Sequence, residues 1–210
     1  MGPVGQALVA SAIVAGLTVA GCGGSSTQSS TGASRGQLHR SSATQHTSRQ
    51  SEPAPTGSIE VAIPTVRREG ESYIPKRYTC YGADLSLPVR WGRIPPRTAQ
   101  LAIFVLNLQP VHSHLFFDWA VAGLRAAPHR ISAGRLPHGA VVGRNSFGTV
   151  SYSICPAKGA HEEHYVVRVV ALPHSLAARP GFDAEALYRE AERSATAVGL
   201  GGGAYEPPRA

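Results

Sequence analysis

The chain has little charge, no long basic run and no long series of apolar segments. Charged residues make up 16% of its 210 residues, against about a quarter in ordinary soluble proteins. Its longest basic run is the pair Arg67-Arg68, although the formal net charge is +7. A clustered basic stripe is the usual mark of nucleic-acid binding, so we expect no nucleic acid as partner. A single continuously apolar segment excludes a protein with many membrane spans.

Common enzyme and metal motifs are also missing. No H-x-x-x-H or C-x-x-C pair occurs, and Ser146 lies outside a G-x-S-x-G context, so no nucleophile, base and orienting group can be assigned. On an extended segment, His112 and His114 would point to one face. A divalent metal there is the alternative to two solvated loop histidines. We predict no cofactor and no enzyme, with an enzyme that uses Asp118 and Glu163 as an alternative.

What the chain does have is apolar residues, glycine and proline in proportions that favour β structure. Hydrophobic residues amount to 42%, enough for a core, beside 23 Gly and 16 Pro. Short apolar runs between loops predict buried strands at 59–63, 89–91, 101–107, 116–124 and 165–172. Asp183 is a candidate N-cap for a helix over 182–198 that ends at Gly199. This order predicts a mostly β, α+β domain on antiparallel sheets, with the helix last.

The N-terminus predicts export. Residues 7–20 form a short apolar run, and Val19-Ala20-Gly21-Cys22 resembles the bacterial lipobox, in which the chain is cut before a cysteine that is then lipidated. The first six residues depart from that pattern because they contain no Lys or Arg. An ordinary secretory signal with a coincidental Cys22 is the alternative. We expect 1–21 to be a lipoprotein signal peptide and the protein to be anchored to the cell membrane at its extracytoplasmic face.

Residues 22–57 predict a flexible tether. Of the 35 residues from 23 to 57, 14 are Ser or Thr, and such a stretch cannot bury enough apolar surface to offset its ordering entropy. The folded domain is therefore expected at 58–210.

Four stretches in this domain carry a resemblance to a known family: Ile74-Pro75 with Tyr78-Thr79-Cys80-Tyr81-Gly82 and Leu85 to Trp91; Leu101-Ala102-Ile103; Gly143 to Gly148 with Tyr152 and Cys155-Pro156; and Glu163-His164-Tyr165 into Ala171-Leu172. In this order and spacing they resemble the bacterial, Raf-kinase-inhibitor-like branch of the phosphatidylethanolamine-binding protein family. The resemblance implies a β-sandwich-like core with peripheral helices. It also implies a small surface pocket for phosphate-type head groups, built in the family from an Asp, two His, a Tyr and loop amides.

This chain departs from the family at the pocket itself. Asn107 stands in the slot of the Asp, and Asp118 and Glu163 stand in those of the two His, while Tyr165 is retained. Ser153 precedes Ile154 where the family has Gly-Pro, and His114 is a donor that could compensate. An ionised carboxylate accepts hydrogen bonds but cannot donate them, so the two exchanges should repel an anion.

Several functions remain open for such a pocket. It could take an amine, a sugar hydroxyl or a cation, it could have lost its ligand, or it could still bind phosphate. We expect a membrane-anchored binding protein with an unknown small ligand or protein partner. An inhibitor of a kinase or protease is the alternative that the resemblance implies.

The cysteines left after Cys22 are Cys80 and Cys155, which the family's fold would bring to the same end. Export permits a disulfide, and the sequence leaves open whether they form one or stay free.

Overall fold

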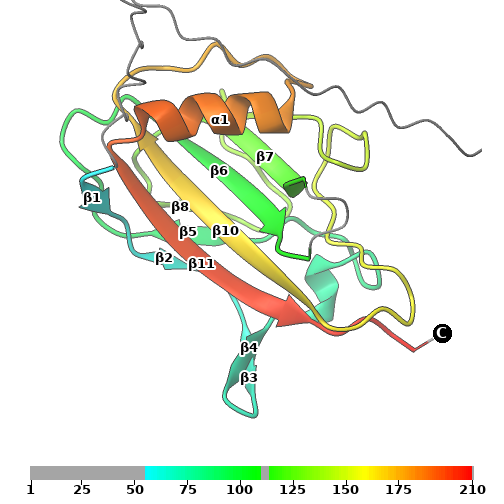
Figure 1. Cartoon of the computed structure of the whole chain (residues 1–210). Coiled ribbons are helices and arrows are strands. Elements are labelled where there is room, and N and C mark those ends of the chain that lie inside the picture. Colours follow the sequence, from blue (N-terminus) through cyan, green and yellow to red (C-terminus); the bar gives the residue numbers. More distant parts are fainter. Residues whose placement is uncertain (1–54, 110–113, 210) are drawn as a thin grey trace, which may run out of the picture. The chain divides into compact units, whose positions relative to one another are not determined.

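The computed structural model describes residues 55–109 and 114–209, which fold into two β-sheets and one α-helix (Figure 1). Residues Arg49–Ala210 form one compact unit. Both hydrophobic clusters of the described residues lie within this unit, so it carries its own core. The predicted signal peptide, Cys22 and nearly all of the tether lie outside the described residues. No helix of the described part is long and apolar enough to span a membrane.

The elements follow one another in the order β1 Gly57–Ser58, β2 Val61–Ala62, β3 Val66–Arg68, β4 Glu71–Tyr73, the 3-10 turn η1 Lys76–Tyr78, β5 Val89–Trp91, β6 Gln100–Asn107, β7 Phe116–Leu124, β8 Arg130–Ile131, β9 Val141–Val142, β10 Glu163–Leu172, α1 Ala184–Ser194 and β11 Ala197–Tyr205. The mostly β, α+β class is confirmed, and so are the strands expected at 89–91, 101–107, 116–124 and 165–172. The run at 59–63 contributes only the two residues of β2.

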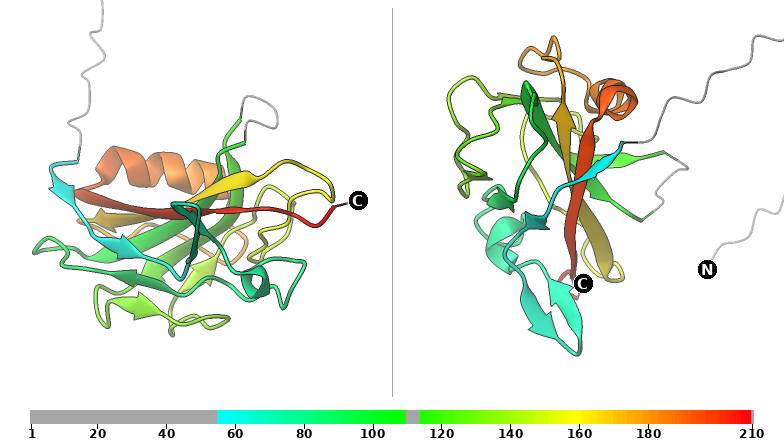
Figure 2. Two further views of the ribbon diagram at one scale, coloured as in Figure 1. Left: turned by 90° about the horizontal axis from the view of Figure 1, so that it is seen from below. Right: turned by 90° about the vertical axis from the view of Figure 1, so that its left-hand side faces the viewer.

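The large sheet has the order β3-β4-β11-β10-β6-β7-β9, with β1 beside β11. Its central pairs, β11 with β10, β10 with β6 and β6 with β7, are antiparallel, whereas β1 and β4 run parallel to β11. The small sheet has the order β2-β5-β8. The left view of Figure 2 shows α1 on one side of the large sheet and the small sheet on the other.

Both faces of the central strands are therefore covered, which explains their continuous apolar sequence. On β6, Ile103 and Val105 belong to the cluster that includes Val89 of the small sheet, while Phe104 and Leu106 belong to the cluster that includes Leu187 of α1. Complete burial of a side chain of this size stabilises the fold by about 1.5–3 kcal/mol.

Helix α1 begins as predicted but ends earlier. The Asp183 side chain accepts a hydrogen bond from the Ala186 amide at 2.7 Å, which is an N-cap contact. The expectation of a helix to residue 198 is wrong, because α1 ends at Ser194 and Ala195 is already extended. The helix is also not the last element, since β11 follows it and pairs with β10 along its length.

Strand β11 escaped prediction because its glycines look like a loop. The space around them shows why they are needed. A Cβ on Gly199 would lie 2.3 Å from the Ile59 carbonyl oxygen, and one on Gly202 would lie 2.6 Å from that of Tyr165. Real Cβ atoms do not approach that closely, so neighbouring backbone excludes a side chain at these two positions.

Two β-bulges interrupt the pairing of β6 with β7. Between the pairs Val105–Trp119 and Leu106–Phe117, strand β7 has one extra residue, Asp118. A second extra residue falls between the pairs Ile103–Val121 and Leu101–Leu124. Bulges commonly redirect side chains near sites, and both of these border a pocket.

Candidate functional site

The first bulge turns Asp118 into the protein. Its neighbours Phe117 and Trp119 belong to the two different hydrophobic clusters, and the Asp118 side chain is buried, with 1% exposed. Neither carboxyl oxygen accepts a hydrogen bond from any residue that the structure describes. A buried polar group without a partner costs about 1–3 kcal/mol, so this arrangement calls for an explanation.

Glu163 lies nearby at the start of β10, and its carboxylate does have partners. Its Oε2 atom accepts a hydrogen bond from Nδ2 of Asn107 at 2.6 Å and another from the Tyr165 hydroxyl at 2.8 Å. Tyr165 pairs with Asn107 across β10 and β6, which brings the three side chains together. The predicted group Asn107, Glu163 and Tyr165 is therefore one hydrogen-bonded cluster.

Asp118 and this cluster influence each other's pKa values. Burial raises the pKa of Asp118 well above its ordinary value, and the charge of Glu163 raises it further. Burial, the hydrogen bond to Glu163 and the charge of Asp118 raise the pKa of Tyr165. Two carboxyl groups that influence each other in this way favour a state in which one of them keeps its proton.

The sequence analysis missed two members of this site, Asp84 and Tyr152. Burial raises the Asp84 pKa, and a hydrogen bond with Ser153 partly opposes the rise. The pKa of Tyr152 is raised by burial first, then by the charges of Asp118 and Asp84. Both residues stand in or beside the stretches that carry the family resemblance, but only the fold shows that they line one pocket and that Tyr152 lies near the charge of Asp118.

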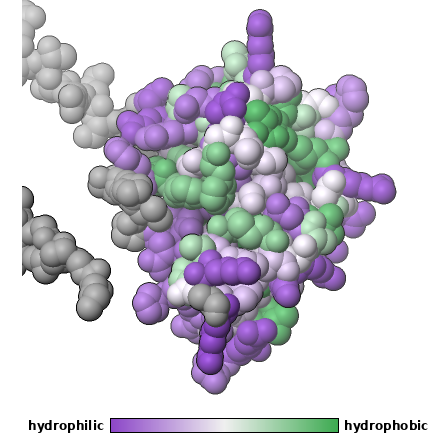
Figure 3. Space-filling model, turned by 90° about the vertical axis from the view of Figure 1, so that its right-hand side faces the viewer, coloured by the Kyte–Doolittle hydropathy of each residue, from purple (hydrophilic) through white to green (hydrophobic). Residues whose placement is uncertain are grey.

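A pocket of about 440 Å³ opens at this acidic end of the molecule. Its lining includes Asp84, Trp119, Tyr152 and Arg135. The rings of Trp119 and Tyr152 meet edge to face with centroids 5.4 Å apart, and the Tyr152 hydroxyl donates to the Tyr78 carbonyl at 2.6 Å. Figure 3 faces this end of the molecule and shows hydrophobic surface interrupted by hydrophilic side chains.

The remaining predicted residues have different roles. The Ser153 amide donates to the Asp118 carbonyl at 3.1 Å, so Ser153 is part of the site's backbone frame. His114 is exposed, and no hydrogen bond joins it to the carboxyl pair among the described residues. His112 lies outside them, so the predicted pair His112 and His114 is not described. Within 55–109 and 114–209, no three His, Cys, Asp or Glu gather closely enough to hold a metal ion.

A disulfide closes the frame of the acidic end. Cys80 and Cys155 are bonded, with their Cα atoms 5.2 Å apart. The Cys80 amide also donates to the Ile154 carbonyl at 3.1 Å. The bond thus joins the loop after η1 to the segment whose Ser153 contacts Asp118.

Comparisons with known proteins agree with this fold. The model of the phosphatidylethanolamine-binding protein family matches residues 66–206. A UPF0098 protein of Methanothermobacter thermautotrophicus is 33% identical over 118 residues, which are 53% of this chain and 76% of that protein. The UPF0098 protein YbcL of Escherichia coli is 31% identical over 109 residues, 48% of this chain and 60% of YbcL.

Solved structures share the fold. The crystal structure of Escherichia coli YbcL, described as a new member of the mammalian PEBP family, has a TM-score of 0.64 at 22% identity and covers 71% of this chain and 99% of its own. A phosphatidylethanolamine-binding protein homolog from Chlamydia trachomatis, CT736, has a TM-score of 0.62 at 23% identity, covering 72% and 99%. The chain belongs to the phosphatidylethanolamine-binding protein family.

Proposed function

We propose that this protein is an exported, lipid-anchored binding protein whose acidic pocket takes a small organic cation such as a primary amine. The observation that carries the proposal is Asp118, a buried carboxyl group without a hydrogen-bond partner among the described residues, beside the ionisable Glu163. An ammonium group that reached Asp118 would supply the missing donors and offset the repulsion between the two carboxyl groups. Because Asp118 is buried and does not line the pocket, the side chains between them must move for this contact to form.

The walls of the pocket suit such a ligand. Trp119 and Tyr152 supply aromatic surface, which attracts cations through the ring electrons. Asp84 is the carboxyl group among the lining residues, which also include Arg135, while Asp118 is buried next to Trp119 in β7 and does not line the pocket. The Asp118 pKa is raised, so a cation that binds there would displace a proton. Affinity for the amine should therefore increase as pH rises towards the raised pKa of Asp118.

Calorimetry with ethanolamine and inorganic phosphate tests the choice of ligand. On the 49–210 unit we expect ethanolamine to bind more tightly than phosphate, with protons released on binding. Asp118→His combined with Glu163→His restores two donors and should reverse the preference. One charge-assisted hydrogen bond contributes about 1.5–3 kcal/mol, so phosphate affinity should rise roughly tenfold or more over the native unit.

The exposed carboxyl group of Glu190 on α1 offers a matched control. Glu190→Gln removes one negative charge far from the pocket and should leave ethanolamine binding unchanged. Tight phosphate binding by the native unit that is lost in the double-histidine variant would show that the carboxyl groups serve an anionic ligand, and the proposal would then be wrong.

The anchor rests on the sequence Val19-Ala20-Gly21-Cys22. In the full chain, Cys22→Ser should move the protein from the membrane fraction to the soluble exported fraction. Ser26→Ala, in the same polar segment, is the control and should leave the protein with the membrane. A Cys22→Ser protein that remains fully membrane-bound would favour an uncleaved apolar helix over a lipid.

A further inference from the structure

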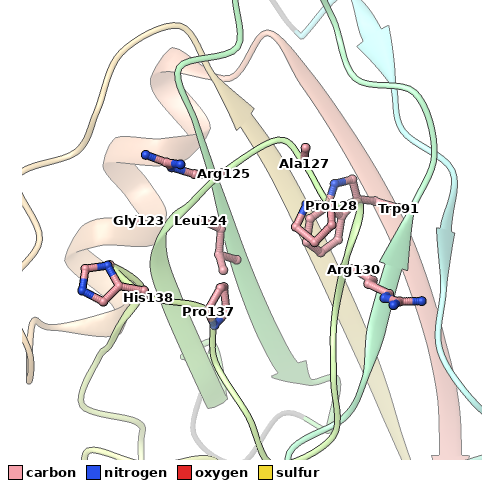
Figure 4. A pocket seen from close by; sticks show the side chains of 10 residues that line it. Trp91, Gly123, Leu124, Arg125, Ala127, Pro128, Arg130, Pro137 and His138 are labelled. Carbon is pink, nitrogen blue, oxygen red and sulfur yellow. The ribbon is translucent and has the colours of Figure 1, made fainter.

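A second pocket, of about 460 Å³, lies at the end of β7 formed by Leu124. The segment 125–130, which leads into β8, and the turn at 137–139 border it on its other sides. Three of the bordering residues are basic, so it is called the basic pocket, at the basic end of β7. Figure 4 shows the side chains of Leu124 and Pro137 near the cavity, whereas that of Arg130 points away from it. The cavity therefore offers room beside β8, and the charge of Arg130 lies outside it.

Strand β8 is an edge of the small sheet, whose order is β2-β5-β8. The Trp91 amide of β5 donates to the His129 carbonyl at 3.0 Å, so these two residues form a hydrogen-bonded pair. In an antiparallel ladder such pairs alternate with pairs that exchange no hydrogen bonds. Arg90 and Arg130, the next pair along, are therefore of the second kind. The amide and the carbonyl of Arg130 consequently point away from β5 and toward the free edge.

Arg90 and Arg130 also place two like charges side by side on the outer face of the small sheet. Their neighbours Val89, Trp91 and Ile131 belong to the core, so the alternation of side chains turns both arginines outward, where they are exposed. Like charges directly opposite each other destabilise a sheet. A charge on the edge strand alone can serve to keep other chains away, but Arg90 lies on the central strand. The pair therefore calls for an external partner of opposite charge.

The surroundings do not neutralise this pair. The ion pairs among the described residues involve neither Arg90 nor Arg130. The nearby carboxyl group of Glu60 stands beside β2, at the opposite edge of the small sheet, and takes part in none of these ion pairs either. Residues 85–161 contain eight Lys and Arg but a single acidic residue, the buried Asp118. A carboxylate that approaches β8 from outside therefore meets attraction from both arginines.

We propose that the free edge of β8 binds an extended acidic segment of a partner protein, which adds an antiparallel strand to the small sheet. The backbone of this segment pairs with Arg130, and carboxylates on its alternate residues lie on the outer face beside Arg130 and Arg90. The residues between them point into the basic pocket, toward Leu124 and Pro137, where small apolar side chains fit. A polysaccharide or a nucleic acid could use the arginines but not the strand edge. This surface does not depend on the function proposed for the acidic pocket.

Fluorescence anisotropy with a labelled peptide of eight residues, in which Glu alternates with Val, tests the pattern. The matched peptide has the same composition, with four Glu followed by four Val. We expect the 49–210 unit to bind the alternating peptide saturably and at least about tenfold more tightly, because only alternation places all carboxylates on one face of a strand. Equal binding of the two peptides, or no saturable binding up to about 1 mM, would overturn the proposal.

Methylation of the peptide amides tests the strand itself. A Glu that lies opposite Arg130 at the free edge exchanges two backbone hydrogen bonds with it. N-methylation of the Glu residues should therefore weaken binding at least about tenfold, whereas N-methylation of the Val residues, whose amides point away from β8, should be tolerated. If both methylated peptides bind equally well, the attraction is one of charge without strand addition, and the proposal is wrong.

Variants of the protein test the arginines. Arg90→Gln with Arg130→Gln should weaken binding of the alternating peptide at least about tenfold. Thermal melting verifies that this variant is folded, and it should melt no lower than the native unit because a repulsion has been removed. Arg193→Gln is the matched control, since Arg193 is an exposed arginine on α1, across the large sheet from the small one. An equal loss in the control would show unspecific attraction to a basic protein and would contradict the proposal.

Polygalacturonate, an acidic polysaccharide without a peptide backbone, distinguishes the class of partner. It should bind the 49–210 unit more weakly than the alternating peptide at equal carboxylate concentration. Tighter binding of polygalacturonate that depends on Arg90 and Arg130 would assign this face to a polysaccharide and would overturn the proposal.

Discussion

The two ends of β7 share a backbone irregularity and differ in chemistry. Near its start, the extra residue is Asp118, and the bulge directs a carboxyl group into the core. Near its end, the irregularity includes Gly123, whose positive φ of 77° and lack of a side chain let a loop approach. The first pocket lies beside buried carboxyl groups and a disulfide, whereas the second is bordered by basic residues and framed by hydrogen bonds that the amide and the indole of Trp91 donate.

This difference shows how one strand can border two pockets with different side chains. A bulge redirects a side chain and bends the strand locally. The residue at that position and the segments around it then decide the chemistry, so the two ends can be changed independently.

The largest effect expected is from removal of the disulfide. The bond closes a separation of 75 residues, which corresponds to about 4 kcal/mol in the chain-entropy model. Cys80→Ser with Cys155→Ser should therefore lower the free energy of unfolding by about 2–5 kcal/mol, measured by denaturant unfolding of the 49–210 unit. A variant that unfolds at the same denaturant concentration as the native unit would show that the bond adds nothing to the stability of the fold.

Gly123→Ala should damage the basic end selectively. An alanine there must adopt a positive φ and displace the Gly139 carbonyl, and strained backbone of this kind costs about 1–3 kcal/mol before the clash is added. Gly148→Ala is the control, since Gly148 has a φ of 83° with no atom within 4 Å of the added Cβ. Thermal melting of both variants should show the larger loss at Gly123, and equal losses would argue against the close approach.

Asp118→Asn should stabilise the acidic end at neutral pH. The Asp118 pKa is higher in the folded protein than the ordinary 3.8, so its contribution to stability is present at low pH and declines as pH rises through the raised pKa. The variant removes this decline, so its free energy of unfolding at neutral pH should be higher by about 1–3 kcal/mol. Each kcal/mol should raise Tm by about 2–4 °C.

Melting curves of native and variant units should diverge progressively from about pH 4 upwards. Glu190→Gln, at an exposed carboxyl group, should follow the native curve. An Asp118→Asn variant that melts below the native unit at pH 8 would show that the ionised carboxylate has a stabilising partner.

Local sequence patterns were enough to predict the fold class and most of the strands. Strands β6, β7 and β10 were predictable because both of their faces are buried, so each reads as a continuous apolar run. The N-cap at Asp183 was predictable because it needs only a side chain three residues before an amide. Strand β11 was not predictable from the sequence. Its glycines are required by the close approach of the backbone at Ile59, Tyr165 and Ser72, which are distant in sequence.

At the acidic site, the resemblance to the family was enough to collect Asn107, Asp118, Glu163 and Tyr165, but it could not show that Asp118 is the extra residue of a bulge. The contributions of Asp84 and Tyr152 required the fold, because no local signal relates them to β7. The basic pocket had no sequence signal, since its arginines are spread over segments with no basic run.

By itself, the sequence determined the class of fold, the positions of its apolar strands and the start of its helix. These follow from interactions between near neighbours, whereas the exchange of two histidines for carboxyl groups was visible only through the resemblance to the family. The tertiary structure decided the register of β6 with β7, the burial of Asp118 and the pairing of Cys80 with Cys155. Each of these depends on which distant backbones approach one another, and that is settled only when the two sheets pack.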